Sequence, residues 1–215
     1  MKAIIFGASG MVGTEVLSEC LSNDYITTVV SVVRKASGIE HPKLTEIEHL
    51  DYTDYSALSM DLMDADVCYF CIGVYQNRVS KEMLWEITVD YVAALILKFE
   101  DLNLKVRFCL FSAQGADPRE RTPMLFAKAK GRAERILFES KIGDSYAFRA
   151  GFINPVKKSG ISGLALFFFR IVYKILPSVG INADDLGKTM VEVGIRGHEM
   201  KIFENRDLRT MIRPS

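Results

Sequence analysis

The sequence lacks an excess of charge, because 27 lysines and arginines are balanced by 27 aspartates and glutamates. A neutral chain offers no basic field that would attract nucleic acid or an anionic membrane surface. Histidine is also scarce: His41, His49 and His198 are scattered, and none of them forms a ligand pair on one helix. We therefore expect no nucleic-acid partner and no metal site.

Long hydrophobic runs are missing as well. At the N-terminus Lys2 precedes four apolar residues before Gly7, which is too short for the apolar core of a signal peptide. The most apolar later stretch, residues 163–177, is interrupted by Arg170 and Lys174 and falls short of the ~20 residues that span a bilayer. The sequence therefore predicts a cytoplasmic protein with no membrane span.

Cysteine is too rare for a disulfide framework, since the chain has only Cys20, Cys68, Cys71 and Cys109. All of them lie within apolar segments, which fits a reducing compartment. Cys68 and Cys71 form a C-x-x-C pattern, but in a strand residues three apart point to opposite faces. We interpret them as core residues and not as a redox pair.

What the sequence does contain is an alternation of short apolar strands with helices. Helical spacing recurs after Gly7, around residues 84–95, over 123–140 and from 182 to 193. Buried or alternating runs predict strands at residues 3–6, 27–33, 44–50, 66–73, 106–111, 145–149 and 200–204. Continuously apolar strands are typical of a parallel sheet covered on both faces, so the predicted fold class is doubly wound α/β.

The length and composition favour one domain over residues 1–215. After Gly151 the pattern changes, and residues 161–176 are rich in aromatic side chains. We predict that residues 151–199 contribute a small cap on the substrate side, with Phe167–Phe169 buried beside the substrate cleft or at a subunit contact. A homodimer is compatible with this pattern, and a helix lying at a membrane interface is the alternative.

Three glycines, Gly7, Gly10 and Gly13, follow the first predicted strand in the stretch GASGMVG. In a strand-turn-helix unit such glycines make the turn, let the backbone approach a pyrophosphate and let the helix pack on the strand. The phosphates would lie at the positive N-terminus of the helix. A tight turn with no ligand is the alternative, but the position at the start of an α/β chain favours a dinucleotide site.

The end of the second predicted strand indicates which dinucleotide is bound. NAD sites usually place an acidic residue there for the ribose hydroxyls, whereas NADP sites place an arginine for the 2′-phosphate. This chain has Arg34 and Lys35 at that place and no acid. The two cations are either solvated surface residues or the 2′-phosphate site, and we favour NADP(H).

Several motifs together resemble an atypical short-chain dehydrogenase/reductase, an NAD(P)-binding Rossmann protein, and in particular the TIP30 (CC3) group. They are GASGMVG, Arg34 after the second strand, LDYTD around Asp51, CIG at 71–73 and SAQGAD at 112–117. The resemblance covers residues 1 to about 155 well. It implies a cofactor site made of Gly7, Ser9, Gly10, Met11, Val12, Arg34, Lys35, Asp51, Tyr52, Ile72, Gly73, Lys130 and Phe152.

The resemblance also implies a place for each part of the dinucleotide. Asp51 and Tyr52 would border the adenine, and Ile72 and Gly73 the adenosine ribose and the pyrophosphate. Phe152 would lie at the nicotinamide end.

The family's catalytic pattern is a serine after the fifth strand and a tyrosine four residues before a lysine. The i, i+4 spacing puts both side chains on one helix face, where the ammonium lowers the pKa of the phenol. Here Ser112 and Lys130 match, but Phe126 stands at the tyrosine position. Phenylalanine has no proton to give, and loss of a general acid typically lowers a rate by a factor of about 10² to 10⁴.

Each remaining candidate has a second interpretation. Ser112 would orient the substrate or cap backbone groups, and Lys130 would hold the ribose or lie solvated on a cation-rich helix. Tyr75, after the fourth strand, would supply the missing proton or be a surface residue. A hydrolase is not supported, because Ser112 and Asp117 lack a nearby histidine and the G-x-S-x-G pattern.

The sequence thus predicts an NADP(H)-binding oxidoreductase that transfers hydride to a small carbonyl-type substrate. The alternative is a non-catalytic dinucleotide-binding sensor or interaction protein in which Phe126 has abolished proton transfer.

Overall fold

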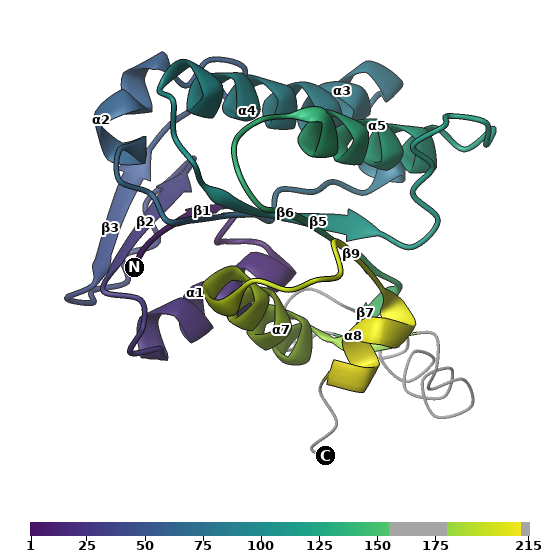
Figure 1. Ribbon diagram of the computed structural model, residues 1–215. Coiled ribbons are helices and arrows are strands. Elements are labelled where there is room, and N and C mark those ends of the chain that lie inside the picture. The colour runs from purple at the N-terminus through teal and green to yellow at the C-terminus, as the bar shows by residue number, and fades with distance from the viewer. Residues whose placement is uncertain (155–179, 212–215) are drawn as a thin grey trace.

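The computed structural model describes residues 1–154 and 180–211, and its centre is a seven-stranded sheet (Figure 1). The strands lie in the order β3-β2-β1-β4-β5-β6-β9, and every neighbouring pair is parallel. The order reverses between β1 and β4, as in a doubly wound fold, and the predicted class is confirmed. The strands are β1 (Lys2–Phe6), β2 (Thr28–Val33), β3 (Leu44–Glu48), β4 (Val67–Phe70), β5 (Arg107–Ala113), β6 (Ser145–Ala150) and β9 (Ile202–Glu204).

Helices cover both faces of this sheet (Figure 1). On one face lie α1 (Met11–Ser22), α7 (Ala183–Arg196) and α8 (Asn205–Met211). On the other lie α2 (Ser59–Leu62), α3 (Lys81–Trp85), α4 (Tyr91–Asp101) and α5 (Leu125–Glu139). Short turns of 3-10 helix, η1 (Ser56–Leu58) and η2 (Gln76–Arg78), and a π-helical turn, η3 (Glu86–Asp90), complete this side.

The strand β1 shows why a continuous apolar run suits the middle of such a sheet. Ala3 and Ile5 pack into the core beneath α1 and α7, whereas Ile4 and Phe6 pack into the core on the opposite face. Since successive side chains of a strand alternate between faces, both sets must be apolar to be buried. Fully burying one such side chain contributes about 1.5 to 3 kcal/mol.

The strand β4 ends earlier than the sequence predicts. The run 66–73 predicts a strand through Gly73, but the strand stops at Phe70. The Cys71 amide still donates to the Phe6 carbonyl at 2.8 Å, and the next residues run close to the backbone of Gly7. Residues 71–73 therefore lie at the edge of the sheet, beside the glycine turn.

Part of the segment predicted to form a cap, residues 151–199, instead belongs to the layer that covers the sheet. Residues 183–196 form α7, and its buried Leu186, Met190 and Val193 recur at helical spacing and pack into the core that contains Val16 of α1. The sequence analysis missed this because the helix follows an aromatic-rich stretch. Residues 161–176 lie outside the described residues, and the division of the chain into one domain stays a prediction.

A second, two-stranded sheet lies beyond the main one. It pairs β7 (Phe152–Asn154) with β8 (Gly180–Asn182) in parallel, and the sequence analysis did not predict it. Three-residue strands are too short to show an apolar pattern. In the side chains, the Asn154 amide donates to the Asn182 carbonyl oxygen at 3.1 Å, and the Asn182 amide donates to Asp185 at 2.8 Å.

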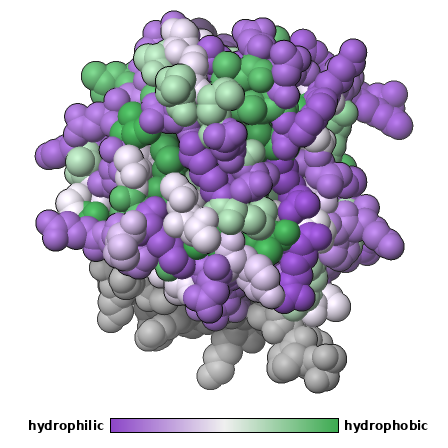
Figure 2. Space-filling model, turned by 60° about the vertical axis from the view of Figure 1, so that its left-hand side comes forward, coloured by the Kyte–Doolittle hydropathy of each residue, from purple (hydrophilic) through white to green (hydrophobic). Residues whose placement is uncertain are grey.

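The surface is mixed in character. On the face shown in Figure 2, hydrophobic residues lie scattered between hydrophilic ones. Within residues 1–154 and 180–211, none of the helices combines the length and the apolar character that a bilayer crossing requires.

Candidate functional site

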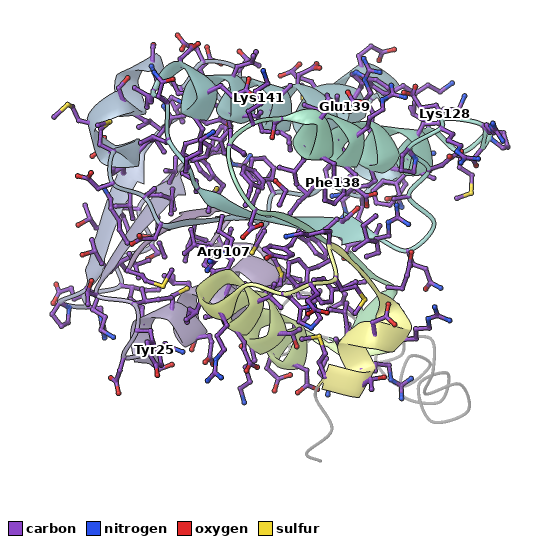
Figure 3. The ribbon with its side chains drawn as sticks, viewed as in Figure 1. Tyr25, Arg107, Lys128, Phe138, Glu139 and Lys141 are labelled. Carbon is purple, nitrogen blue, oxygen red and sulfur yellow. The ribbon has the colours of Figure 1, made fainter. Side chains whose placement is uncertain are left out.

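The carboxyl edge of the sheet is where the predicted site residues gather. Parallel strands all end at this edge, and α1 and α5 both begin there (Figure 1). Figure 3 marks the direction of α5, with Lys128 near its start and Lys141 just beyond its end. In doubly wound folds, ligands bind outside the carboxyl ends of the strands next to the point where the strand order reverses. Here that point lies between β1 and β4.

The glycine turn after β1 is built so that backbone segments touch. Gly7 has a φ of +85°, and a Cβ placed there would lie 2.8 Å from the Ile72 amide nitrogen. A Cβ at Gly13 would overlap the Gly7 carbonyl oxygen. Two of the predicted glycine roles, the strained turn and the close packing of helix on strand, are therefore visible in the geometry.

The N-terminus of α1 is open at this turn. Its N-cap is Gly10, which has no side chain to cap the first amides, and Ser9 and Gly10 are exposed. Met11 is 36% exposed, while Val12 is buried in the core. Uncapped amide groups and the positive end of the helix dipole make this a suitable place for a phosphate group.

Arg34 and Lys35 follow β2, and both are exposed. Burial raises the pKa of Tyr52, and the positive charge of Arg34 opposes that shift. The charge of Arg34 also opposes the rise in the pKa of Tyr91 that burial causes. The Tyr52 and Tyr91 rings are stacked with centroids 5.4 Å apart. Arg34 therefore lies near a pair of tyrosines at this edge of the sheet.

The two residues expected at the adenine differ in their environment. Asp51 is exposed, and it accepts hydrogen bonds from the Thr53 hydroxyl at 2.6 Å and the Thr53 amide at 2.9 Å, which lower its pKa. Tyr52 is only 5% exposed, and its hydroxyl donates to the Val32 carbonyl at 3.4 Å. The Tyr52 ring thus belongs to the core, which does not fit the expected contact with adenine. Tyr91, the half-buried partner in the stack, was not predicted, because helical spacing alone gave no signal for it.

The residues after β4 line the same edge. Ile72 is half-buried, and Gly73 is exposed, with the position of its missing Cβ 3.9 Å from the Phe111 ring. Tyr75 is 63% exposed, and the guanidinium of Arg78 lies 5.3 Å from the centre of its ring. Tyr75 therefore lies on the surface at this edge of the sheet. Phe152 is half-buried in β7, outside the main sheet.

Lys130 is a buried cation on α5. It is 4% exposed, and its Nζ donates to the Phe111 carbonyl at 2.9 Å and lies 5.3 Å from the centre of the Phe111 ring. Burial lowers the pKa of Lys130 to about 8, and the Glu134 carboxylate opposes that shift. An ammonium has three N–H donors. Among the described residues only the Phe111 carbonyl accepts a hydrogen bond from it.

Ser112 does not face the edge at which the strands end. It is 1% exposed, and its hydroxyl donates to Glu134 Oε1 at 2.5 Å. In this conformation the hydroxyl cannot contact a substrate, so the predicted substrate-orienting role does not fit. The reason is strand alternation, because Ser112 projects toward α5 on the same side as Leu110.

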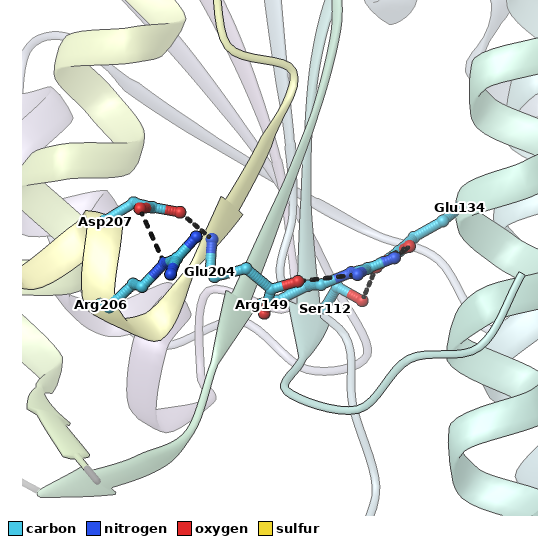
Figure 4. A network of polar contacts seen from close by, with 6 residues as sticks. All are labelled: Ser112, Glu134, Arg149, Glu204, Arg206 and Asp207. Atoms are coloured by element: carbon cyan, nitrogen blue, oxygen red, sulfur yellow. Dashed lines mark hydrogen bonds and ion pairs between the residues drawn. The ribbon is translucent and has the colours of Figure 1, made fainter. Parts of the chain in front are cut away.

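Glu134 is the centre of a buried polar network (Figure 4). The Arg149 guanidinium donates to both of its carboxylate oxygens, with Nη2 2.5 Å from Oε2 and Nε 2.9 Å from Oε1. Arg149 also donates to Glu204 Oε1 at 2.8 Å, and its hydrogen bonds with Glu134 raise its pKa. The sequence analysis missed Arg149 and Glu204; the available signal was a cation inside the strand SYAFRA.

The cysteines behave as the sequence predicts. Cys68 and Cys71 pack into cores on opposite faces of the sheet. Burial raises the pKa of the Cys71 thiol to about 12 and that of Cys68 well above its ordinary value. Both are free thiols, and their protonated state fits core residues. The described part of the chain also brings together no group of side chains that would hold a metal ion.

Comparisons with known proteins agree with this fold. The model of the NAD dependent epimerase/dehydratase family matches residues 3–126. Protein fmp52-2, mitochondrial, of Aspergillus terreus is 24% identical over 159 residues, covering 73% of this chain and 69% of that protein.

Solved structures show the same fold. A Bacillus halodurans structure described as an NAD-dependent epimerase/dehydratase aligns with a TM-score of 0.69 and 20% identity over 94% of this chain and 92% of that chain. The Bordetella bronchiseptica enzyme WbmH in complex with NAD+ aligns with a TM-score of 0.69 and 17% identity over 94% of this chain and 74% of that chain.

A parallel sheet with a glycine turn at its reversal point defines an NAD(P)-binding Rossmann protein of the atypical short-chain dehydrogenase/reductase type. The chain belongs to the NAD dependent epimerase/dehydratase family.

Proposed function

We propose that this protein is an oxidoreductase that binds NADP(H) and transfers hydride to a small carbonyl-type substrate. The observation that carries the proposal is the pairing of an uncapped helix N-terminus at the glycine turn with a buried ammonium, Lys130, that has unused donors. The first suits a pyrophosphate and the second a ribose hydroxyl. A dinucleotide offers both groups in one molecule.

The preference for NADP(H) rests on Arg34. Arg34 is exposed at the end of β2, where the ribose of the adenosine half would lie, and a guanidinium can bind a phosphate through two parallel hydrogen bonds. Asp51 is the acid on the neighbouring loop, and its carboxylate is already engaged with Thr53. Arg34 therefore supports a 2′-phosphate better than a free ribose hydroxyl.

When bound, the reduced nicotinamide supplies the hydride that adds to the carbonyl carbon of the substrate. The chain must hold the dinucleotide and let a proton reach the carbonyl oxygen. Lys130 would hold the ribose, but Phe126, four residues earlier on α5, has no proton to donate. The proton would come from Tyr75 or from water, because Ser112 is committed to Glu134.

Phe126 and the buried Ser112 also favour a second candidate. A protein that keeps the dinucleotide site without a complete proton path would act as a sensor of the dinucleotide or as an interaction protein. Neither residue provides the hydroxyl of the family's pattern at the carboxyl edge, so both observations support this candidate.

Binding and turnover separate the two candidates. We would titrate NADPH and NADH by calorimetry and then screen small aldehydes and ketones for oxidation of NADPH at 340 nm. Binding with turnover would support the oxidoreductase, and binding without turnover the sensor. If neither dinucleotide binds, both proposals are wrong. Lys105→Glu, which changes a surface charge before β5 at the opposite edge, is the control for nonspecific loss of binding.

A further inference from the structure

Two carboxylates and two cationic side chains lie between α5 and the strands β6 and β9, next to the candidate site. Lys130 and Glu134 are one turn apart on α5, Arg149 is on β6 and Glu204 is on β9. Glu134 is fully buried, and the Arg149 and Glu204 side chains are 13% and 37% exposed. Arg149 joins the two acids by ion pairs, as Figure 4 shows.

The charges of this group balance only when Lys130 is included. Arg149 carries one positive charge but pairs with two carboxylates, Glu134 and Glu204, so one negative charge remains. Side chains four residues apart on a helix share one face, and the Glu134 charge acts on Lys130 although the two groups form no direct ion pair. A buried ammonium is unstable without a counter-charge, and Glu134 is placed to provide it.

Two hydrogen bonds also fix α5 against the end of β5. Lys130 donates to the carbonyl of Phe111, and Ser112, the next residue of β5, donates to Glu134. The contacts are therefore one residue apart on the strand and one turn apart on the helix. This double connection sets the position of the Lys130 ammonium relative to the carboxyl edge.

We propose that Glu134, held in place by Ser112 and Arg149, is the positioning residue that keeps the buried Lys130 protonated and seated against the Phe111 carbonyl. Glu134 does not touch a ligand in this arrangement and acts through Lys130. The importance of this role for the dinucleotide rests on the proposed function, because it is there that Lys130 holds the ribose.

The surroundings of Lys130 make its charge sensitive to Glu134. Among the described residues, the titratable groups that act on it are Glu134 on its own helix and Cys71 at the end of β4, and β5 contributes the Phe111 carbonyl and ring. Glu134 in turn faces Ser112 on β5 and Arg149 on β6. Burial lowers the pKa of Lys130 to about 8, so the Lys130 charge is present below that pH and is lost above it.

The test measures the titration of Lys130 directly and without a ligand. Protein with lysine labelled at the ε carbon with ¹³C would be titrated by NMR, with the Lys130 signal assigned from Lys130→Arg. Glu134→Gln should lower the Lys130 midpoint by about one pH unit or more, because it removes the carboxylate charge that opposes the effect of burial on Lys130. Glu204→Gln, which removes the other acid of Arg149, is the matched control and should change the midpoint much less. An unchanged midpoint in Glu134→Gln, or an equal change in both variants, would overturn the proposal.

A double variant keeps the proposal testable if Glu134→Gln does not fold. Lys130→Met combined with Glu134→Gln removes the ammonium together with its counter-charge, so the double variant should show a cooperative urea unfolding transition even where Glu134→Gln shows none. A double variant that also shows no cooperative transition would contradict the proposed pairing of the two charges.

NADPH binding then connects this role to the proposed function. Affinity for NADPH should fall as the pH rises through the Lys130 midpoint, and in Glu134→Gln the fall should move to lower pH by the same amount. If the NMR midpoint moves as expected while the wild-type protein binds no NADPH at any pH, the positioning role stands and the proposed function is wrong. If NADPH binds but the Lys130 midpoint does not move in Glu134→Gln, the proposed function stands and the positioning role of Glu134 is wrong.

Discussion

Backbone groups form one side of the candidate site, at the glycine turn, and side chains form the other, at α5. The glycine turn offers backbone, because side chains are absent at Gly7, Gly10 and Gly13 and the first amides of α1 have no side-chain cap. The α5 side offers side chains, but Ser112 is already paired with Glu134, and Glu134 is paired with Arg149. We call the glycine turn the open side, because the first amides of α1 are uncapped. We call the network of Ser112, Glu134 and Arg149 the closed side, because its polar groups bond to one another.

This difference separates binding from chemistry. A backbone cradle binds a phosphate whatever reaction follows, whereas proton transfer needs a free hydroxyl at a defined place. Lys130 belongs to both sides, since it donates to the Phe111 carbonyl and still has unused donors. The structure therefore supports a dinucleotide site more fully than it supports a complete catalytic set.

The largest effect should come from restoring the missing hydroxyl. Phe126→Tyr adds one oxygen on the helix face of Lys130, and the change in volume is small enough for the fold to tolerate. We expect NADPH-dependent carbonyl reduction to rise by a factor of about 10² to 10⁴. Phe138→Tyr, the same substitution near the end of α5, should leave the rate unchanged (Figure 3).

Steady-state rates with a panel of aldehydes would measure this gain. If the wild-type protein already reduces a carbonyl briskly and Phe126→Tyr does not improve it, the proton comes from elsewhere, with Tyr75 or water as the next candidate. No gain with NADPH still bound would mean that the substrate pocket has diverged as well.

Removing Arg149 from the buried network should strongly lower the free energy of unfolding. Arg149→Leu leaves the carboxylate of the fully buried Glu134 without its cation, and loss of one partner of a buried pair costs about 3 to 5 kcal/mol. Arg132→Leu is the matched control: its side chain is 42% exposed and pairs with Glu120, so a loss of about 0 to 1 kcal/mol is expected. Urea unfolding followed by circular dichroism compares the two, and equal losses would show that the network contributes no more than a surface ion pair.

Most of the sheet could be predicted from the sequence because buried parallel strands have a strong local pattern. VCYF and RFCL are apolar at every position or nearly so, and such runs have few other stable environments. The role of α7 was harder to predict, since it depends on packing against α1, which is about 170 residues earlier in the chain. Local periodicity gave the helix but not the layer in which it lies.

The site divides in the same way. The glycine turn could be predicted because its function needs particular residue types at fixed spacing. The direction of Ser112 and the pairing of Glu134 with Arg149 could not, because the sequence does not show which of several polar residues face one another across β5, β6 and α5. Tyr52 likewise was placed at the adenine by the family resemblance, which does not show that its ring is buried while the side chain of its neighbour Asp51 is exposed.

The open side can be tested by adding one methyl group. Gly7→Ala places an L side chain at a φ of +85° and its Cβ 2.8 Å from the Ile72 amide nitrogen. The backbone strain costs roughly 1 to 2 kcal/mol and the overlap about 1 to 3 kcal/mol more. Gly115→Ala is a close control, because its φ is +86° and its Cβ would have no neighbour within 4 Å. The difference between their free energies of unfolding isolates the contact between the two backbone segments, and no difference would mean that the turn relaxes easily.

The smallest expected effect concerns which dinucleotide the open side prefers. Arg34 is exposed at the end of β2, and a charge-assisted contact with the 2′-phosphate should make NADPH bind more tightly than NADH by about tenfold or more. Arg34→Glu replaces that contact with repulsion and offers a carboxylate to the ribose hydroxyls, so the preference should reverse. Lys105→Glu makes the same change of charge at the opposite edge and should leave the ratio of the two dissociation constants unaltered, which separates a contact from a general change in net charge. Equal affinities in the wild-type protein, or a ratio that Arg34→Glu does not change, would remove Arg34 from the site and leave Lys35 as the remaining cation after β2.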